Sequence, residues 1–349
     1  KTTFLLQYAK EKFGFDRSCL FVNMNNFYFS QYSLVDFAGE FVKRGGKVLL
    51  IDQVFKLPDW SHDLRICYER YPNLKIVFTG SSVMRLKDEN PELNGIVRSY
   101  NLRGFSFREF LNLQTGNHFS SYSLEEILTN HEHIAKTILP HTNPLNYFQD
   151  YIHHGFYPFF LEKRNFSENL LKTMNMMIEV DILLIKQIEL KYLSKIKKLL
   201  YLLAVDGPVA PNVSQLAADI QTSRATVMNY IKYLADARLI NMVYPKGEVF
   251  PKKPAKIMMH NTNLMYSIYP VKVEEQDVLE TFFVNSLWKD HKVNKGEKGT
   301  SFIVDENLNF RICNEGYKFK NNPNIYYAMH KSELGHGNQI PLWLFGFLY

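Results

Sequence analysis

The first third of the chain alternates short apolar runs with segments in which apolar residues recur at helical spacing. The apolar runs predict strands, which are Ser18–Met24, Lys47–Asp52 and Lys75–Ser82. The amphipathic segments predict helices, which are Ser33–Gly45, Trp60–Pro72 and a short one after Gly104. Because strands this apolar are buried on both faces, the pattern predicts an α/β fold with a parallel sheet between two layers of helices.

The rest of the chain shows three further patterns. Residues 112–190 are mostly helical and aromatic, and residues 271–349 contain β-leaning segments that end in an apolar core strand, IPLWLFGFLY. Residues 191–270 contain a helix, a short second helix, a longer third helix and a hairpin, which is typical of a winged helix-turn-helix. Its expected core stripe consists of Val213, Leu216, Ala217, Ile220, Val227, Ile231 and Leu234. We therefore expect four parts, 1–111, 112–190, 191–270 and 271–349.

The composition narrows the class of protein. Of the 349 residues, 46% are hydrophobic and 22% are charged, which predicts a globular chain of two or three domains. The net charge of +6 allows contact with nucleic acid without requiring it. Three widely spaced cysteines argue against a zinc ribbon or a disulfide framework and fit a reducing cytoplasm. The histidines are scattered and predict no metal site, and no apolar run is long enough to span a membrane.

The first residues of the chain carry a candidate phosphate site. Lys1, Thr2 and Thr3 stand at the head of an apolar helix, as do the last residues of a P-loop. In that motif the Lys binds the β- and γ-phosphates and the Thr hydroxyl binds Mg²⁺, while preceding glycines wrap the phosphates. Because the chain begins with Lys rather than Met, we expect the glycines to lie upstream of Lys1.

Polar residues follow two of the predicted strands. Asp52 ends the buried strand VLLID, the position from which a Walker B aspartate helps to hold Mg²⁺. Thr79, Ser81 and Ser82 end the next strand, where a polar residue can act as a sensor of the nucleotide. The alternative for each strand is a core strand that simply ends in a polar residue.

Seven segments along the whole chain resemble one family of proteins. They are FVKRGGKVLLID with KLPDWSHDL, YPNLKIVFTGSS, LRGFSFREFL, NTNLMY, ETFFVN and IPLWLFGFLY. The family is that of bacterial and archaeal AAA+-type P-loop ATPases with a C-terminal domain similar to PD-(D/E)xK nucleases, the DUF4143 type. The resemblance implies a P-loop NTPase core at 1–111, a helical lid at 112–190, a winged helix at 191–270 and a small α/β restriction-endonuclease-like domain at 271–349.

This chain departs from the family at positions that carry chemistry. The family has a catalytic Glu after the Walker B Asp, and Gln53 stands there; an amide cannot accept the proton of the attacking water. Paired arginines of the family match Gly95 and Ile96, so we expect the arginine finger to be missing. The alternative is a substitute from nearby, Arg98 or Arg103. An acidic pair after the first strand reads Asn25-Asn26. Hydrolysis is therefore expected to be weak or lost.

The third helix of the winged helix carries candidate contacts to DNA. Arg224, Asn229 and Lys232 lie on its expected exposed face, where the Arg and the Asn would read base edges. The hairpin would bind phosphates through its lysines, Lys246, Lys252, Lys253 and Lys256. The alternative is a winged helix that serves packing or assembly and has a solvated basic face.

The C-terminal part lacks the residues of a nuclease site. The family's Asp, Glu and Lys match Ser301, Arg311 and Glu315, and an Arg at a carboxylate position repels a metal ion. Glu280 and Asp305 remain as isolated carboxylates, which are more often surface charges or caps. We therefore expect this domain to be structural.

Taken together, the sequence predicts a cytoplasmic ATP-binding protein that uses Mg²⁺ and hydrolyses ATP weakly or not at all. The alternative is a non-enzymatic module that binds DNA or a protein through the winged helix. A nuclease is the third hypothesis and the weakest. The expected partners are a nucleotide and either duplex DNA or a protein, with no membrane, and a homo-oligomer is left open.

Overall fold

The computed structural model describes residues 1–80, 90–162, 164–183, 186–288, 290–297, 299–317 and 322–349. The chain forms two compact units, Lys1–Arg103 and Gly104–Tyr349, which are described separately. Among the described residues, no helix combines the length and the apolar character needed to cross a membrane.

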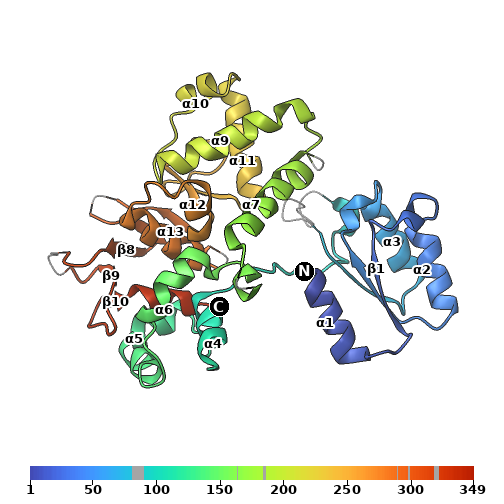
Figure 1. Ribbon diagram of the computed structural model, residues 1–349, viewed down its shortest axis with the longest axis horizontal. Helices are drawn as coiled ribbons and strands as arrows, with labels where there is room; N and C mark the ends of the chain where they lie inside the picture. The colour runs from blue at the N-terminus through green and yellow to red at the C-terminus, as the bar shows by residue number, and fades with distance from the viewer. Residues whose placement is uncertain (81–89, 163, 184–185, 289, 298, 318–321) are drawn as a thin grey trace. The chain divides into compact units, whose positions relative to one another are not determined.

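The first unit is a three-stranded parallel sheet with helices on both faces (Figure 1). The strands lie in the order β1-β2-β3, with β2 in the centre. Helix α1 packs on one face through Leu5, and α2 and α3 pack on the other face. The elements are α1 (Thr2–Phe13), β1 (Cys19–Asn23), η1 (Phe27–Ser30), α2 (Leu34–Lys43), β2 (Val48–Asp52), η2 (Val54–Lys56), α3 (Trp60–Arg70), β3 (Lys75–Phe78) and η3 (Pro91–Leu93).

The predicted strands and helices of this unit are confirmed, with shorter bounds. Strand β2 is buried at all five positions, as its continuous apolar run predicts. Helix α2 begins where Ser33 accepts a hydrogen bond from the N–H of Asp36, so the Ser cap fixes its start. The predicted third strand extends to Ser82, but Ser81 and Ser82 lie outside the described residues.

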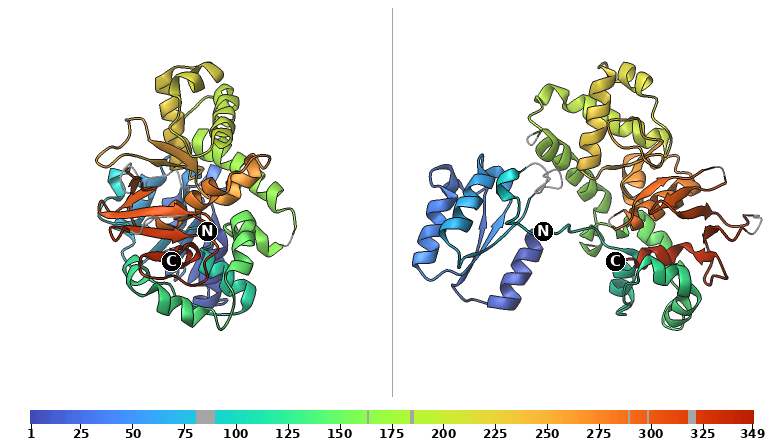
Figure 2. Two further views of the ribbon diagram at one scale, coloured as in Figure 1. Left: turned by 90° about the vertical axis from the view of Figure 1, so that its left-hand side faces the viewer. Right: turned by 180° about the vertical axis from the view of Figure 1, so that it is seen from behind.

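The second unit contains a five-stranded sheet flanked by helices. Its strands lie in the order β10-β9-β8-β7-β6, in which β8, β9 and β10 are parallel and the β6–β7 and β7–β8 pairs are antiparallel. Helices α9–α11 lie at one end of this unit and α5 and α6 at the other, with the sheet between them (Figure 2).

The helices that precede the five-stranded sheet in the chain are α4 (Phe107–Thr115), α5 (Leu124–Ile138), α6 (Leu145–Asp150), η4 (Tyr151–Gly155), η5 (Pro158–Glu162), α7 (Phe166–Met176), η6 (Met177–Ile182), η7 (Leu190–Tyr192), α9 (Leu193–Asp206), α10 (Val213–Asp219), α11 (Arg224–Asp236), α12 (Thr262–Ile268) and α13 (Glu275–Leu287). The remaining elements are β4 (Ile240–Val243), β5 (Lys256–Met259), β6 (Val293–Lys295), β7 (Phe302–Val304), β8 (Leu308–Cys313), β9 (Ile325–Met329), β10 (Gln339–Pro341) and η8 (Leu342–Phe347).

The second unit begins at Gly104, because Phe107 and Phe110 of α4 belong to its apolar core. The bounds of the four predicted parts stay predictions. The predicted core strand at the end of the chain is instead the 3₁₀ helix η8, whose side chains are all buried. A run that is apolar at every position has no periodicity to separate a strand from a buried helix.

The segment 191–270 contains the predicted order of elements. Helices α9, α10 and α11 are followed by β4 and β5, which pair antiparallel, and Val209 forms a further bridge to Ile257 of β5. The whole predicted core stripe of this segment is buried. The segment is not a separate unit, because Tyr244 bridges Asn294 and so joins the end of β4 to the five-stranded sheet.

Candidate functional site

Asp52 lies at the centre of a group of polar side chains at the end of β2. Its side chain is almost fully buried, with 1% of the residue exposed. Its Oδ1 accepts a hydrogen bond from Thr79 Oγ1 at 2.6 Å, and its Oδ2 accepts from Thr2 Oγ1 at 2.9 Å and from Asn23 Nδ2 at 3.0 Å. Three donors therefore stabilise a carboxylate that would be costly to bury alone.

The sheet topology explains why these residues meet. Strands β1, β2 and β3 are parallel, so their carboxyl ends lie at one edge of the sheet. Asn23 pairs in register with Asp52, and Thr79 directly follows β3. Thr2 reaches the same place as the first residue of α1. Four separate segments thus contribute one polar group each to this edge.

Lys1 lies beside the end of β3. Its Nζ donates a hydrogen bond to the carbonyl oxygen of Gly80 at 2.5 Å. Thr3 is exposed on the first turn of α1, away from the hydrogen bonds to Asp52. Ser81, the other predicted sensor, lies outside the described residues.

Gln53 follows Asp52 in a left-handed conformation, with a φ of 58°. Its backbone N–H donates to Thr79 Oγ1 at 3.1 Å, and its Oε1 accepts from Asn25 Nδ2 at 3.0 Å. These two bonds hold a backbone conformation that is unfavourable for a residue with a long side chain. The amide of Gln53 consequently lies at the edge of the sheet that carries Asp52.

The oxygens at this edge suit a hard divalent cation. Carboxylate and hydroxyl oxygens, here from Asp52 and Thr2, are the ligands that Mg²⁺ prefers, and Mg²⁺ usually takes its other ligands from water and phosphate. In keeping with this, the part of the chain that the structure describes holds no group of three or more His, Cys, Asp or Glu that could bind a metal alone. The residues present therefore fit Mg²⁺ bound together with a phosphate ligand.

Two asparagines contribute to this site: Asn25, which belongs to the pair singled out in the sequence, and Asn23, which the sequence did not predict. Asn23 donates to Asp52, and Asn25 donates to Gln53. Asn26, the other half of the Asn25-Asn26 pair, caps η1 by accepting from the N–H of Tyr28. The signal in the sequence was that Asn23 ends the strand that neighbours β2 and that Asn25 follows two residues later.

The positions that match the family's arginines lie away from these hydrogen bonds. Gly95 adopts a positive φ of 79°, which favours glycine, and Ile96 is half-buried against the apolar core of the first unit. The nearby Arg98 stacks its guanidinium over the Tyr100 ring at 5.1 Å.

The residues predicted to contact DNA lie on α11 and on the hairpin of the second unit. Arg224 and Asn229 are exposed on α11. Lys232 is half-buried and pairs with Asp236, while Lys252 pairs with Glu248 at 3.2 Å. Lys253 is exposed in the hairpin.

The predicted nuclease positions serve structural contacts. Ser301 is buried, and its hydroxyl accepts from the N–H of Ile312 at 3.2 Å. Arg311 stacks over Tyr317, and Glu315 pairs with Lys331. A structural role for this part of the chain stays a prediction.

Asp305 and Glu280, the two carboxylates that remain in the predicted nuclease-like part, differ in their burial. Asp305 pairs with His291 at 2.6 Å near the surface. Glu280, expected to be an isolated surface charge or a cap, is instead buried, with 7% of the residue exposed. Its carboxylate accepts from Lys256 Nζ at 2.5 Å and from Gln276 Nε2 at 3.2 Å. This expectation for Glu280 was therefore wrong.

Comparison with known proteins relates the first unit to a family. Residues 1–111 match the model of a family described as an AAA domain, and residues 145–272 match a domain of unknown function, DUF8612. The first part of the chain is therefore related to nucleotide-binding AAA-type ATPases. The family matched in the second part differs from the DUF4143 type that the sequence motifs suggested.

One curated relative is an uncharacterized protein of Methanocaldococcus jannaschii. It is 28% identical over 210 residues, which cover 59% of this chain and 44% of the relative. The match thus spans less than half of the relative's length. No solved structure matches the chain.

Proposed function

We propose that the first unit binds a nucleoside triphosphate with Mg²⁺, with ATP as the expected ligand. The observation that carries this proposal is the meeting of Thr2, Asp52 and Thr79 through direct hydrogen bonds at the carboxyl edge of a parallel sheet. The match of residues 1–111 to an AAA domain supports it. Ligands of open parallel sheets bind at this edge.

Each residue has an expected task in this proposal. Lys1 binds the terminal phosphates, and Thr2 and Asp52 hold Mg²⁺ directly or through its water. When bound, Mg²⁺ neutralises charge on the phosphates. Thr79, which donates to Asp52 and accepts from the N–H of Gln53, links the metal-binding carboxylate to the residue that faces the attacking water.

Replacing Asp52 with Asn is expected to weaken the binding of Mg²⁺-ATP to the full-length protein by about tenfold or more, because a charged partner of the cation is lost. Titration calorimetry with and without Mg²⁺ measures this effect. Asp59→Asn is the matched control, since Asp59 is exposed and makes no capping hydrogen bond. Equal affinities of the two variants would refute the proposal.

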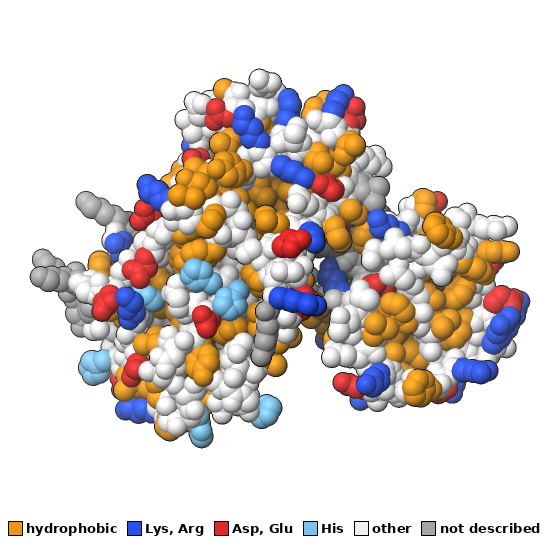
Figure 3. Space-filling view, in the orientation of Figure 1, with side chains coloured by type: hydrophobic (Ala, Val, Ile, Leu, Met, Phe, Trp, Pro, Cys, Tyr) orange, Lys and Arg blue, Asp and Glu red, His pale blue; other side chains and the backbone are white. Residues whose placement is uncertain are grey.

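A second candidate function is the binding of nucleic acid by residues 191–270, for which we propose a winged helix. This segment contains 11 Lys and Arg against 4 Asp and Glu, a net charge of +7, whereas the whole chain carries only +6. In Figure 3 the basic side chains are spread over the part formed by α9–α11. Two of these cations, Lys232 and Lys252, pair with acidic residues of the segment, and four more pair with acidic residues outside it, namely Lys191, Lys197, Lys246 and Lys256. The positive charge left to attract an anionic polymer is therefore smaller than the count for the segment.

Binding of duplex DNA is therefore expected to weaken steeply as salt is raised, since bound counterions are released. Lys253→Ala, which removes a residue expected to bind phosphate, should weaken binding and lower the slope of log affinity against log salt by about one unit. Fluorescence anisotropy over a salt series measures both. Arg44→Ala, an exposed change in the first unit, is the control. Binding that does not depend on salt would exclude this function.

The remaining parts of the proposal rest on the sequence. We infer a helical lid at 112–190 and a degenerate nuclease-like domain at 271–349 with a structural role. The three cysteines are free thiols, which accords with the predicted cytoplasmic location.

A further inference from the structure

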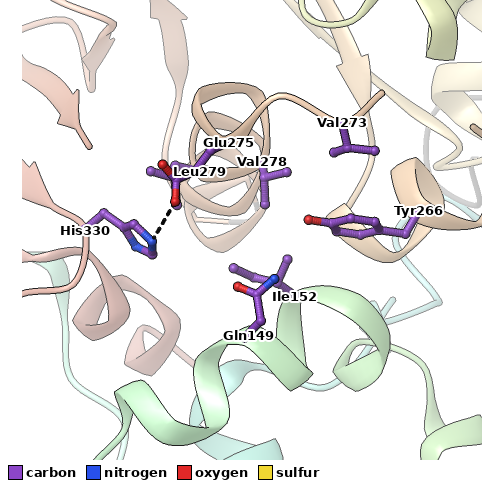
Figure 4. A pocket seen from close by; sticks show the side chains of 8 residues that line it. All are labelled: Gln149, Ile152, Tyr266, Val273, Glu275, Val278, Leu279 and His330. Atoms are coloured by element: carbon purple, nitrogen blue, oxygen red, sulfur yellow. Dashed lines mark ion pairs between the residues drawn. The ribbon is translucent and has the colours of Figure 1, made fainter. Parts of the chain in front are cut away.

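The second unit contains a hollow of about 150 Å³ between η4, α12 and α13 (Figure 4). Ile152, Val278 and Leu279 give it apolar walls, and the hydroxyl group of Tyr266 points into it. An engineered cavity of roughly this volume binds benzene, so the hollow has room for one short side chain or a small molecule of that size.

Two titratable side chains face each other at one side of this hollow. His330 Nε2 lies 3.4 Å from Glu275 Oε1, as the dashed line in Figure 4 marks. The His330 side chain is 8% exposed, whereas that of Glu275 is 52% exposed. The imidazole is therefore fixed within the protein, and the carboxylate is open to an incoming ligand.

The hollow carries a net negative charge at neutral pH. Burial lowers the pKa of His330, and this effect is larger than the opposite effect of the Glu275 carboxylate. The imidazole is therefore neutral, and it does not balance the negative charge of Glu275. The other charged groups near His330 are Lys331 and Glu315, which pair with each other at 2.7 Å. Burial raises the pKa of Tyr266, so its hydroxyl stays neutral.

We propose that this hollow binds an organic cation with a short apolar stem, of the kind found at the end of a lysine or arginine side chain. The cation would bind the Glu275 carboxylate at one side of the hollow, and the stem would contact Val278 and Ile152 on its way toward Tyr266 at the other side (Figure 4). His153 stacks on the Tyr266 ring with centroids 3.8 Å apart, which holds the orientation of the ring. Glu275 disfavours an anion, and a metal ion would find one carboxylate and one imidazole there.

Titration of the full-length protein with n-butylammonium, followed by NMR signals of the Tyr266 ring and the His330 imidazole, tests this proposal. We expect 1-butanol, which has the same stem and no charge, to bind about tenfold or more weakly. Glu275→Gln should reduce the affinity for n-butylammonium by a similar factor, and Glu274→Gln, an exposed neighbour, should not change it. Equal binding of the amine and the alcohol would overturn the proposal.

The pH dependence provides a second readout that needs no variant. Protonation of His330 at low pH adds a positive charge beside Glu275, so the affinity for the cation should be highest above the pKa of His330 and fall below it. An affinity that stays constant across the pH range in which the NMR signals of the His330 imidazole show its protonation would contradict the role of Glu275 and His330.

The same titration distinguishes two sources of such a cation, a basic side chain of a partner protein and a small metabolite. A tripeptide amide with a central lysine that binds more tightly than n-butylammonium would assign the hollow to a basic residue of a partner protein. Tighter binding of the free amine would assign it to a small metabolite. Failure of both to bind would refute the inference without affecting the nucleotide site, which lies in the other unit.

Discussion

Replacing Gln53 with Glu is expected to raise the rate of ATP hydrolysis by about 10²-fold, at the lower end of what a positioned general base contributes. Glu and Gln have the same shape, and Asn25 Nδ2 can donate to a carboxylate oxygen as it does to Gln53 Oε1 at 3.0 Å. The substitution thus supplies a proton acceptor at the residue after Asp52 and keeps the hydrogen bond that positions the side chain. A steady-state phosphate-release assay on the full-length protein measures the effect.

The increase in the hydrolysis rate is limited because the positions of the family's paired arginines hold no arginine in this chain. Gly95 and Ile96 supply no cation, and an arginine finger alone contributes roughly 10³–10⁵. The variant should therefore remain slower than a complete AAA-type ATPase. Gln31→Glu is the control, because Gln31 is exposed in the same unit and undergoes the same chemical change. A parent protein that already hydrolyses ATP at more than about 1 s⁻¹ would contradict the prediction.

The meeting of Asp52 and Thr79 could be predicted from the sequence. Two buried apolar runs that end in polar residues predict parallel strands, and parallel strands connected by helices bring their carboxyl ends to one edge. The contributions of Asn23 and Asn25 could not be predicted in the same way. An amide at the end of a strand carries no signal for its partner, because the register of β1 against β2 decides which side chain it reaches.

The environment of Glu280 shows a stronger limit of sequence reasoning. Glu280 is separated by 24 positions from Lys256, its ion-pair partner, and the two residues lie on α13 and β5. Only the packing of these elements brings the two charges together. A Glu in the sequence predicts a surface position, since Glu is rarely buried unless it is paired. Local pattern thus predicts elements better than it predicts the partners of buried polar groups.

Replacing Lys256 with Met is expected to lower the free energy of unfolding of the second unit by about 3 kcal/mol or more, because it leaves a buried carboxylate without its cation. The Glu280 side chain is 9% exposed, and only Gln276 would remain as a donor. Lys256 also lies over the Phe302 ring, with 5.5 Å between Nζ and the ring centroid, so a cation–π contact is lost as well.

Urea denaturation followed by tryptophan fluorescence measures this loss. In a Trp60→Phe background the remaining tryptophans, Trp288 and Trp343, both lie in the second unit and report on its unfolding alone. Lys252→Met is the matched control, because Lys252 pairs with Glu248 at the surface and such pairs contribute about 0–1 kcal/mol. The prediction fails if both lysine variants shift the midpoint equally.

A double variant separates the lost pair from the lost packing of the lysine stem. Lys256→Met combined with Glu280→Leu removes both charges and fills the space with apolar groups, an exchange that is often neutral or stabilising for a buried ion pair. We expect the double variant to recover most of the stability that the single variant loses. If the two changes were instead additive, the cost of Lys256→Met would lie in packing, and Glu280 would tolerate burial without its cation.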